Sequence, residues 1–359
     1  MSIVDSLIGH EEQIIYPDHE LLQYMGRIDF EDKLAPILVY PSSYVAIKFT
    51  GTSLKIIVEN IHSCWHNYMG YILDGKQEKI LLQNEGTKCI TIANDLEDTE
   101  HSFMLFKRMD SCHVIRFYGF VIDLHGTLQK LPELPERKIE VYGDSITAGE
   151  VSEAVFYTGK PDPIHNGEYS NSWYSYAWIA ARKLNARIHN ISQGGIALRN
   201  GTGWFYGPNY IGMEETFDKI EYHPDLGFIK PWDFSNYRPH VVIIAIGQND
   251  SHPVDCMSEN YDSDDSIAWR VHYKKFVGEI RKRYADALIL LTTTILYHDA
   301  NWDRAIQEVC NEIEDDKILH FMYRRNGCGT PGHIRISEAE EMADELVTYI
   351  NSFGDKIWD

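Results

Sequence analysis

Four polar segments in the second half of the chain contain residue types that can carry out or assist nucleophilic attack on a carbonyl carbon. Ser145 lies in a Gly-Asp-Ser triplet directly after the strand-like run 138–142, and His333 lies in Thr-Pro-Gly-His near the C-terminus. A serine hydroxyl becomes a nucleophile when a histidine takes its proton. Glycine at 195 lets the backbone approach a substrate closely, and Asn249 offers a neutral N–H donor.

The same residues also have ordinary structural interpretations. Ser145 could cap a helix, Gly194-Gly195 could form a turn, Asn249-Asp250 could end a strand, and His333 could precede a helix. Each structural interpretation accounts for one segment, but together they poorly explain why all four segments occur in this order along the chain. We therefore expect that these residues form a catalytic group. Asp144 is expected to hold its loop through side-chain to backbone hydrogen bonds and to take no part in the reaction.

The elements of the second half can bring these distant segments together. Strand-like runs alternate with helical stretches, the strands at 138–142, 186–192, 240–247, 288–294 and 317–323, the helices at 172–185, 266–285 and 337–354. Such alternation predicts a parallel sheet, whose ligands lie outside the carboxyl ends of the strands. Three of the four polar segments follow strands. The fourth precedes the last helix, where Ser337 and Glu340 form a capping-box pattern.

The first third has a different pattern, with strands separated by polar turns and no convincing helix. Gly51-Thr52-Ser53 divides the segment 44–60 and predicts a hairpin, and Asp74-Gly75 predicts a second one within 69–82. Regularly spaced strands favour a β-sandwich of jelly-roll type. The proline-bearing segment 128–138 reads as a linker. We therefore expect a β-sandwich accessory domain at 1–130 and a catalytic domain at 131–359.

The charge balance excludes some classes of ligand. Asp and Glu outnumber Lys and Arg by 54 to 33, which gives a net charge of -21 and argues against nucleic-acid binding. The first 20 residues lack the pattern of a signal peptide, and no stretch approaches the ~20 apolar residues of a membrane span. From the sequence as given we expect a cytoplasmic protein that does not bind membranes.

The six cysteines do not suggest a metal site or a dense disulfide framework, because no CxxC pair occurs. His62, Cys64 and His66 alternate in a way that could place them on one face of a strand, but no second cluster with ligand spacing completes a site. We expect neither a metal nor a cofactor.

The ordered set of Gly-Asp-Ser, a glycine turn, Gly-x-Asn-Asp and a C-terminal histidine resembles the SGNH (GDSL) hydrolase superfamily over roughly residues 137–353. With a β-sandwich in front, the chain is most similar to the acetyl esterases of carbohydrate esterase family 2. The resemblance implies an α/β three-layer sandwich with a central parallel sheet, preceded by an all-β jelly-roll domain. It also implies Ser145 and His333 as catalytic residues, with an oxyanion hole of the Ser145 N–H, the Gly195 N–H and the Asn249 amide.

One position departs from the superfamily pattern. The aspartate that usually stands three residues before the catalytic histidine is Thr330 here. We therefore expect a Ser-His dyad in which a main-chain oxygen of the loop 326–333 accepts the Nδ1–H of His333. A carboxylate from Glu338 or Asp250 is the competing possibility.

A long insertion at 199–240 follows the glycine turn and is rich in aromatic residues. Trp204, Trp232 and Tyr206 are candidate substrate contacts, since aromatic faces can stack on the C–H surfaces of sugars. The same side chains could instead pack the insertion onto the sheet.

These observations predict a serine esterase that removes O-acetyl groups from plant-type polysaccharides or oligosaccharides through an acyl-enzyme on Ser145. The expected partner is an acetylated carbohydrate substrate. Two alternatives remain open, a hydrolase of short-chain lipid or small-alcohol esters and a carbohydrate-binding protein with an inactive hydrolase domain.

Overall fold

The computed structural model describes residues 4–227 and 229–359. The chain divides into two compact units. The first comprises Met1–Leu134, Asn166–Glu168 and Ile220–Lys230, and the second comprises Pro135–His165, Tyr169–Lys219 and Pro231–Asp359. Two short segments that follow Leu134 in the sequence therefore belong to the first unit. A single boundary along the chain does not separate the two units.

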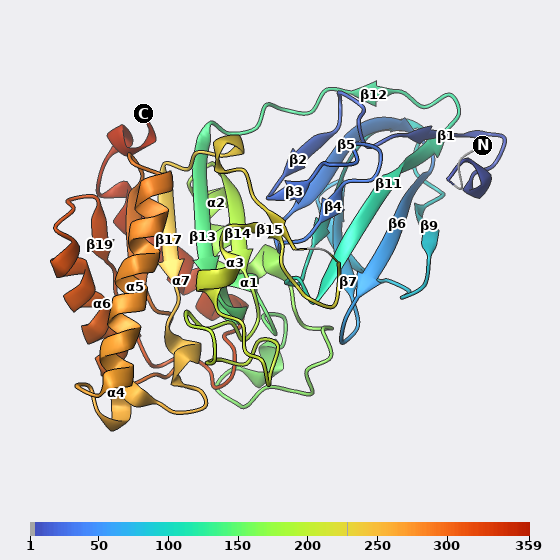
Figure 1. Ribbon diagram of the computed structural model, residues 1–359. Helices are drawn as coiled ribbons and strands as arrows, with labels where there is room; N and C mark the ends of the chain where they lie inside the picture. Colours follow the sequence, from blue (N-terminus) through green and yellow to red (C-terminus); the bar gives the residue numbers. More distant parts are fainter. Residues whose placement is uncertain (1–3, 228) are drawn as a thin grey trace. The chain divides into compact units, whose positions relative to one another are not determined.

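The first unit is built from short antiparallel strands (Figure 1). They are β1 (Glu12–Ile15), β2 (Gln23–Met25), β3 (Ile28–Asp29), β4 (Ile37–Leu38), β5 (Tyr44–Gly51), β6 (Leu54–His62), β7 (Tyr68–Leu73), β8 (Lys76–Leu81), β9 (Thr87–Ala93), β10 (Thr99–Lys107), β11 (His113–Asp123) and β12 (Leu128–Gln129). One sheet has the order β3-β4-β11-β6-β9, with β1 beside β11. The other has the order β12-β5-β10-β7-β8, with β2 beside β5.

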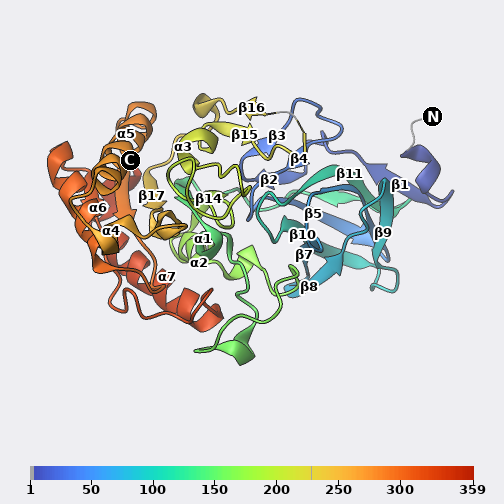
Figure 2. The same ribbon diagram turned by 60° about the horizontal axis from the view of Figure 1, so that its bottom comes forward.

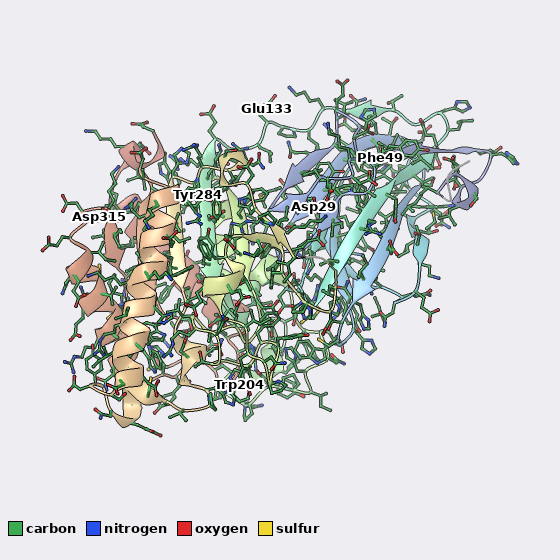
Figure 3. The ribbon with its side chains drawn as sticks, viewed as in Figure 1. Asp29, Phe49, Glu133, Trp204, Tyr284 and Asp315 are labelled. Carbon is green, nitrogen blue, oxygen red and sulfur yellow. The ribbon has the colours of Figure 1, made fainter. Side chains whose placement is uncertain are left out.

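The core of this unit lies between the two sheets. Phe103 of β10 meets Phe120 of β11 edge to face, with ring centroids 5.6 Å apart, and Phe49 of β5 is buried in the same cluster (Figure 3). Alternate residues of each strand fill this layer, as expected for two sheets packed face to face. The predicted β-sandwich is confirmed.

The two predicted hairpins have different outcomes. Asp74 and Gly75 have φ values of 49° and 81° and join β7 to β8, so that hairpin is confirmed. The hairpin at Gly51–Ser53 is wrong, because β5 pairs in one sheet and β6 in the other. Asp123 explains the difference. Its carboxylate accepts the N–H and hydroxyl of Thr52 and the hydroxyl of Ser53, which anchors the turn to the end of β11 while the chain crosses between sheets.

The second unit contains the predicted parallel sheet. Its strands are β13 (Arg137–Gly143), β14 (Ala186–Ser192), β17 (Val241–Ala245), β18 (Leu288–Thr292) and β19 (Ile318–His320), in the order β14-β13-β17-β18-β19. Every residue of β17 and β18 is buried, as in a sheet with both faces covered. A small two-stranded sheet of β15 (Lys219–Glu221) and β16 (Lys230–Pro231) lies within the insertion.

The helices cover both faces of the parallel sheet. They are α1 (Ser145–Ala148), α2 (Tyr176–Lys183), α3 (Met213–Thr216), α4 (Cys256–Glu259), α5 (Asp264–Arg283), α6 (Ala300–Ile313) and α7 (Ile336–Asn351). Short 3-10 turns are η1 (Asp5–Leu7), η2 (Val155–Tyr157), η3 (Ser172–Tyr174), η4 (Phe234–Asn236), η5 (Gln248–Ser251) and η6 (Asp355–Trp358). In Figures 1 and 2, α5 and α6 lie over one face and α2 and α7 over the other. Within the described ranges, no helix combines the length and apolar character that crossing a membrane requires.

Two helix predictions need correction. Helix α6 was not predicted, although Trp302, Ala305, Ile306 and Val309 form a buried stripe at helical spacing. Helix α7 begins at Ile336, and its capping box does not involve Ser337 and Glu340. Glu338 accepts the N–H of Arg335 at 2.9 Å, which moves the cap two residues towards the N-terminus.

We predict that Asp123→Ala lowers the free energy of unfolding of the first unit by about 2 kcal/mol, because three donors lose a charged acceptor. Denaturant unfolding of the full chain measures this change. Asp98→Ala, an exposed acid at the end of the same unit's β9–β10 connection, should cost less than ~0.5 kcal/mol.

The pH dependence of this difference has a defined sign. Burial would raise the pKa of Asp123, but hydrogen bonds from Ser53 and Thr52 hold it below its usual value. The stabilisation is therefore present at neutral pH and lost as the pH falls through the lowered pKa. If the difference in the free energy of unfolding between wild type and Asp123→Ala persists undiminished well below pH ~4, this account is wrong.

Candidate active site

Ser145 stands at the corner where β13 passes into α1. Asp144 caps this short helix by accepting the Ile146 N–H at Oδ1, 3.0 Å away, as expected from the sequence. Burial raises the pKa of the Asp144 carboxyl to about 6, against the opposing effect of this hydrogen bond. Ser145 is 8% exposed, and as the first residue of the helix it has an N–H that no intrahelical carbonyl can accept. The corner presents a hydroxyl and an N–H together.

Gly195 follows β14 and requires its glycine identity. Its φ is 70°, and an added Cβ would lie 2.8 Å from the Cβ of Trp204. The Gly195 carbonyl accepts the N–H groups of Trp204 at 2.7 Å and Phe205 at 3.1 Å. The aromatic insertion therefore begins directly against this glycine.

Asn249 lies in η5, directly after β17, and links the two preceding loops. Its Nδ2 donates to the Ile196 carbonyl at 3.0 Å and lies 3.5 Å from Oδ2 of Asp144. These partners are the sequence neighbours of Gly195 and Ser145. The structure thus brings the three predicted oxyanion donors to the carboxyl ends of three adjacent strands, β13, β14 and β17.

His333 has a carboxylate partner, so the prediction of a main-chain acceptor and a Ser-His dyad is wrong. Asp162 Oδ2 lies 2.6 Å from His333 Nδ1. Neither of the two acids considered from the sequence supplies this contact. Glu338 accepts the N–H groups of Thr330 and Arg335, and Asp250 accepts the Leu198 N–H at 2.7 Å.

The Asp162 carboxylate is held from two further sides. Buried Arg335 donates from Nη2 to Asp162 Oδ1 at 2.8 Å and from Nη1 to the His333 carbonyl at 2.8 Å. Gly332 has a φ of 85°, and a Cβ there would lie 2.3 Å from Asp162 Oδ2. Burial would raise the pKa of Asp162, but hydrogen bonds and charge from His333 and Arg335 hold it below its usual value.

An ionised Asp162 defines the state of the histidine. A carboxylate can only accept, so Nδ1 of His333 is the donor and Nε2 of the neutral ring remains available as a base. The carboxylate also stabilises the imidazolium that forms when Nε2 takes a proton. Together with a serine hydroxyl and clustered N–H donors, this arrangement is suited to acyl transfer.

Thr330, at the position of the usual aspartate, has a structural role instead. Its Oγ1 accepts the Gly159 N–H at 2.8 Å, and its own N–H donates to Glu338 at 2.9 Å. The threonine therefore ties the start of α7 to the segment that carries Asp162. Among residues 4–227 and 229–359, no three His, Cys, Asp or Glu side chains form a group that could hold a metal ion.

Comparison with known proteins agrees with this architecture. Residues 24–132 match the family model "Carbohydrate esterase 2 N-terminal", and residues 141–316 match "GDSL-like Lipase/Acylhydrolase family". A solved structure, a family two carbohydrate esterase from Clostridium thermocellum in complex with cellohexaose, has a TM-score of 0.77 at 28% identity, over 94% of this chain and 100% of that one. Along most of its length the chain is similar to carbohydrate esterase family 2.

Two curated relatives match this chain along most of its length. It is 29% identical to the cellulase/esterase CelE of Acetivibrio thermocellus over 93% of this chain and 40% of that protein. It is 24% identical to an acetylxylan esterase / glucomannan deacetylase of Cellvibrio japonicus over 93% of this chain and 89% of that protein. The chain thus spans less than half the length of the first relative and most of the second.

Asp162 was not predicted from the sequence, because the order of the motifs along the chain pointed to other acids. Asp162 lies between two prolines in the segment 151–171, which joins α1 to η3. The available signal was the length of this segment, since long connections with little regular structure are often functional. Only the fold shows that the segment reaches His333.

The predicted aromatic contacts have different surroundings. Trp204 is 61% exposed and stacks on His252 with ring centroids 3.4 Å apart, among the loops beyond the carboxyl ends of β13 and β14 (Figure 3). Trp232 packs edge to face against His189 within β14, which fits the packing interpretation. Tyr206 follows the buried Phe205. Sugar contact by Trp204, Trp232 or Tyr206 stays a prediction.

We predict that Asp162→Asn lowers kcat for 4-nitrophenyl acetate by ~10⁴-fold, because an amide neither fixes the same tautomer nor stabilises the imidazolium. Gly332→Ala should act in the same direction by displacing the carboxylate. Lys160→Ala, at an exposed position two residues before Asp162, is the control and should stay near wild type. An Asp162→Asn enzyme within tenfold of wild type would remove Asp162 from the catalytic group.

Proposed function

We propose that this protein is a serine esterase that removes O-acetyl groups from plant-type polysaccharides or oligosaccharides, in the manner of an acetyl xylan esterase. The observation that carries the proposal is the 2.6 Å contact between Asp162 and His333, in the same unit as Ser145 and its neighbouring N–H donors. A carboxylate-oriented histidine is the base that serine esterases need.

The reaction proceeds in two halves. The Ser145 hydroxyl attacks the acetyl carbonyl while His333 Nε2 takes its proton, and the protonated ring then gives that proton to the departing sugar oxygen. The acetyl group remains as an ester on Ser145. Water, deprotonated by His333, then attacks this ester. The bond between the acetyl carbon and the Ser145 oxygen breaks, acetate leaves, and the protonated ring returns the proton to Ser145. In both halves the Ser145 N–H, the Gly195 N–H and the Asn249 amide donate to the oxyanion.

A carbohydrate is favoured as the alcohol part of the ester. The matched relatives are named a cellulase/esterase and an acetylxylan esterase / glucomannan deacetylase, and the matched structure was determined with cellohexaose. Trp204 lies nine residues after Gly195 and donates its backbone N–H to the Gly195 carbonyl. Its exposed ring offers a platform for a sugar ring beside the oxyanion hole.

We predict that wild type releases acetate from acetylated xylo-oligosaccharides and hydrolyses nitrophenyl acetate faster than the butyrate and hexanoate esters. Ser145→Ala should lose at least ~10⁴-fold in kcat without loss of stability, whereas Ser258→Ala, at an exposed serine, should not change. Faster turnover of the longer acyl chains would favour a lipid or small-alcohol esterase. A wild type that binds oligosaccharide but cleaves no ester would favour the inactive, binding-only alternative.

We predict that Trp204→Ala raises KM for acetylated oligosaccharides by about 2- to 10-fold and leaves KM for nitrophenyl acetate unchanged. Trp204→Phe keeps an aromatic face and should recover part of the loss. The backbone bond from residue 204 to Gly195 survives either change, so kcat on nitrophenyl acetate tests whether the oxyanion hole is intact. Equal KM values for Trp204→Ala and wild type on both substrates would refute the platform.

A further inference from the structure

A second carboxylate faces His333 at its other ring nitrogen. Glu150 Oε2 lies 3.6 Å from His333 Nε2 and 3.3 Å from Nε2 of His165. Glu150 is only 4% exposed. The His165 ring stacks on the His333 ring, with centroids 5.7 Å apart and an interplanar angle of 27°. Asp162, His333, Glu150 and His165 thus form a cluster of four titratable side chains.

The chain places Glu150 through the same turn that presents Ser145. The Glu150 N–H donates to the Ser145 carbonyl at 3.0 Å, directly after Gly149, which ends α1 with a φ of 82°. A Cβ at Gly149 would lie 2.6 Å from the Asn171 carbonyl oxygen, and the Asn171 N–H donates to the Gly149 carbonyl at 2.9 Å. A shift of Glu150 would therefore disturb the turn that carries the nucleophile.

The electrostatic effect of Glu150 differs from that of Asp162. Both negative charges favour the imidazolium form of His333, but Glu150 lies at the nitrogen that exchanges a proton with Ser145. A buried carboxylate is costly without a partner, and His165 supplies one at 3.3 Å.

Three further charged groups act on His333. Asp162 binds Nδ1, and Arg335 binds the His333 carbonyl and the Asp162 carboxylate. Asp144 interacts electrostatically with both His333 and Glu150. Removal of Glu150 would therefore leave one fewer anion near His333, while Arg335 stays bound to the His333 carbonyl and to Asp162.

We propose that Glu150 is a positioning residue whose charge, held beside Nε2 of His333, sets the lower pH limit of ester cleavage. The inference rests on the function proposed above. It assigns to Glu150 control of the pH range of the esterase. His165 lowers the free-energy cost of burying the Glu150 carboxylate by pairing with it.

The first test is the pH profile of kcat/KM on nitrophenyl acetate for wild type and Glu150→Gln. Removal of the negative charge beside Nε2 leaves the ring available as a base at lower pH. We expect the acidic limb of the profile to move down by about one pH unit. Glu153→Gln changes an acid in the same segment that bonds to Asn171, and it should leave the limb in place.

The second test does not depend on turnover. In a Ser145→Ala background, the His333 ring is titrated by NMR with and without Glu150→Gln, after assignment by comparison with His333→Asn. The titration midpoint should fall by the same amount as the acidic limb. Glu150→Asp retains the charge and should move the midpoint less than Glu150→Gln does, which separates charge from a change of packing.

The outcomes separate this inference from the proposed function. A wild type that cleaves no ester contradicts the proposed function, while the NMR titration still decides the role of Glu150. If Glu150→Gln leaves both the acidic limb and the titration midpoint unchanged in an active enzyme, the inference is overturned and the esterase assignment stands.

Discussion

The hydrogen bond between Asp162 and His333 is the interaction on which the site depends, and it joins residues 171 positions apart in the chain. Without it the imidazole has neither a defined tautomer nor a compensating charge, and the serine lacks an effective base. The bond exists because the segment 151–171 folds back to the loop that precedes α7. Ser152 strengthens this arrangement, since its carbonyl accepts the Ile336 N–H at 3.1 Å.

Several residues that make no contact with the reacting atoms are therefore constrained by that bond. Arg335 fixes the second carboxylate oxygen of Asp162, Gly332 leaves the space that the carboxylate occupies, and Thr330 holds the segment at Gly159. At the position of the usual aspartate, Thr330 anchors the segment that supplies the carboxylate. A site of this kind can keep its chemistry while the source of one group moves.

Local patterns in the sequence were sufficient for much of the architecture. The alternation of apolar runs with helical stretches predicted the parallel sheet, and Asp74-Gly75 predicted its hairpin, because both depend on neighbouring residues. Two of the failures involve contacts between distant segments. The crossing between β5 and β6 depends on Asp123, and the partner of His333 is Asp162. No spacing rule connects such pairs, since each is formed only when the chain has folded. The cap of α7 is a local contact, and it lies in another register because Glu338 accepts the N–H of Arg335.

The backbone hydrogen bonds between Gly195 and the aromatic insertion 199–240 affect which sequence changes the protein can accept. The Gly195 carbonyl is bound by the N–H groups of residues 204 and 205, and the main chain offers these groups whatever side chains those positions carry, proline excepted. Side chains in this loop can therefore be exchanged during evolution while the neighbouring glycine keeps its conformation. The shape of the surface beside Gly195 and the conformation of Gly195 itself are therefore physically adjacent but genetically separable.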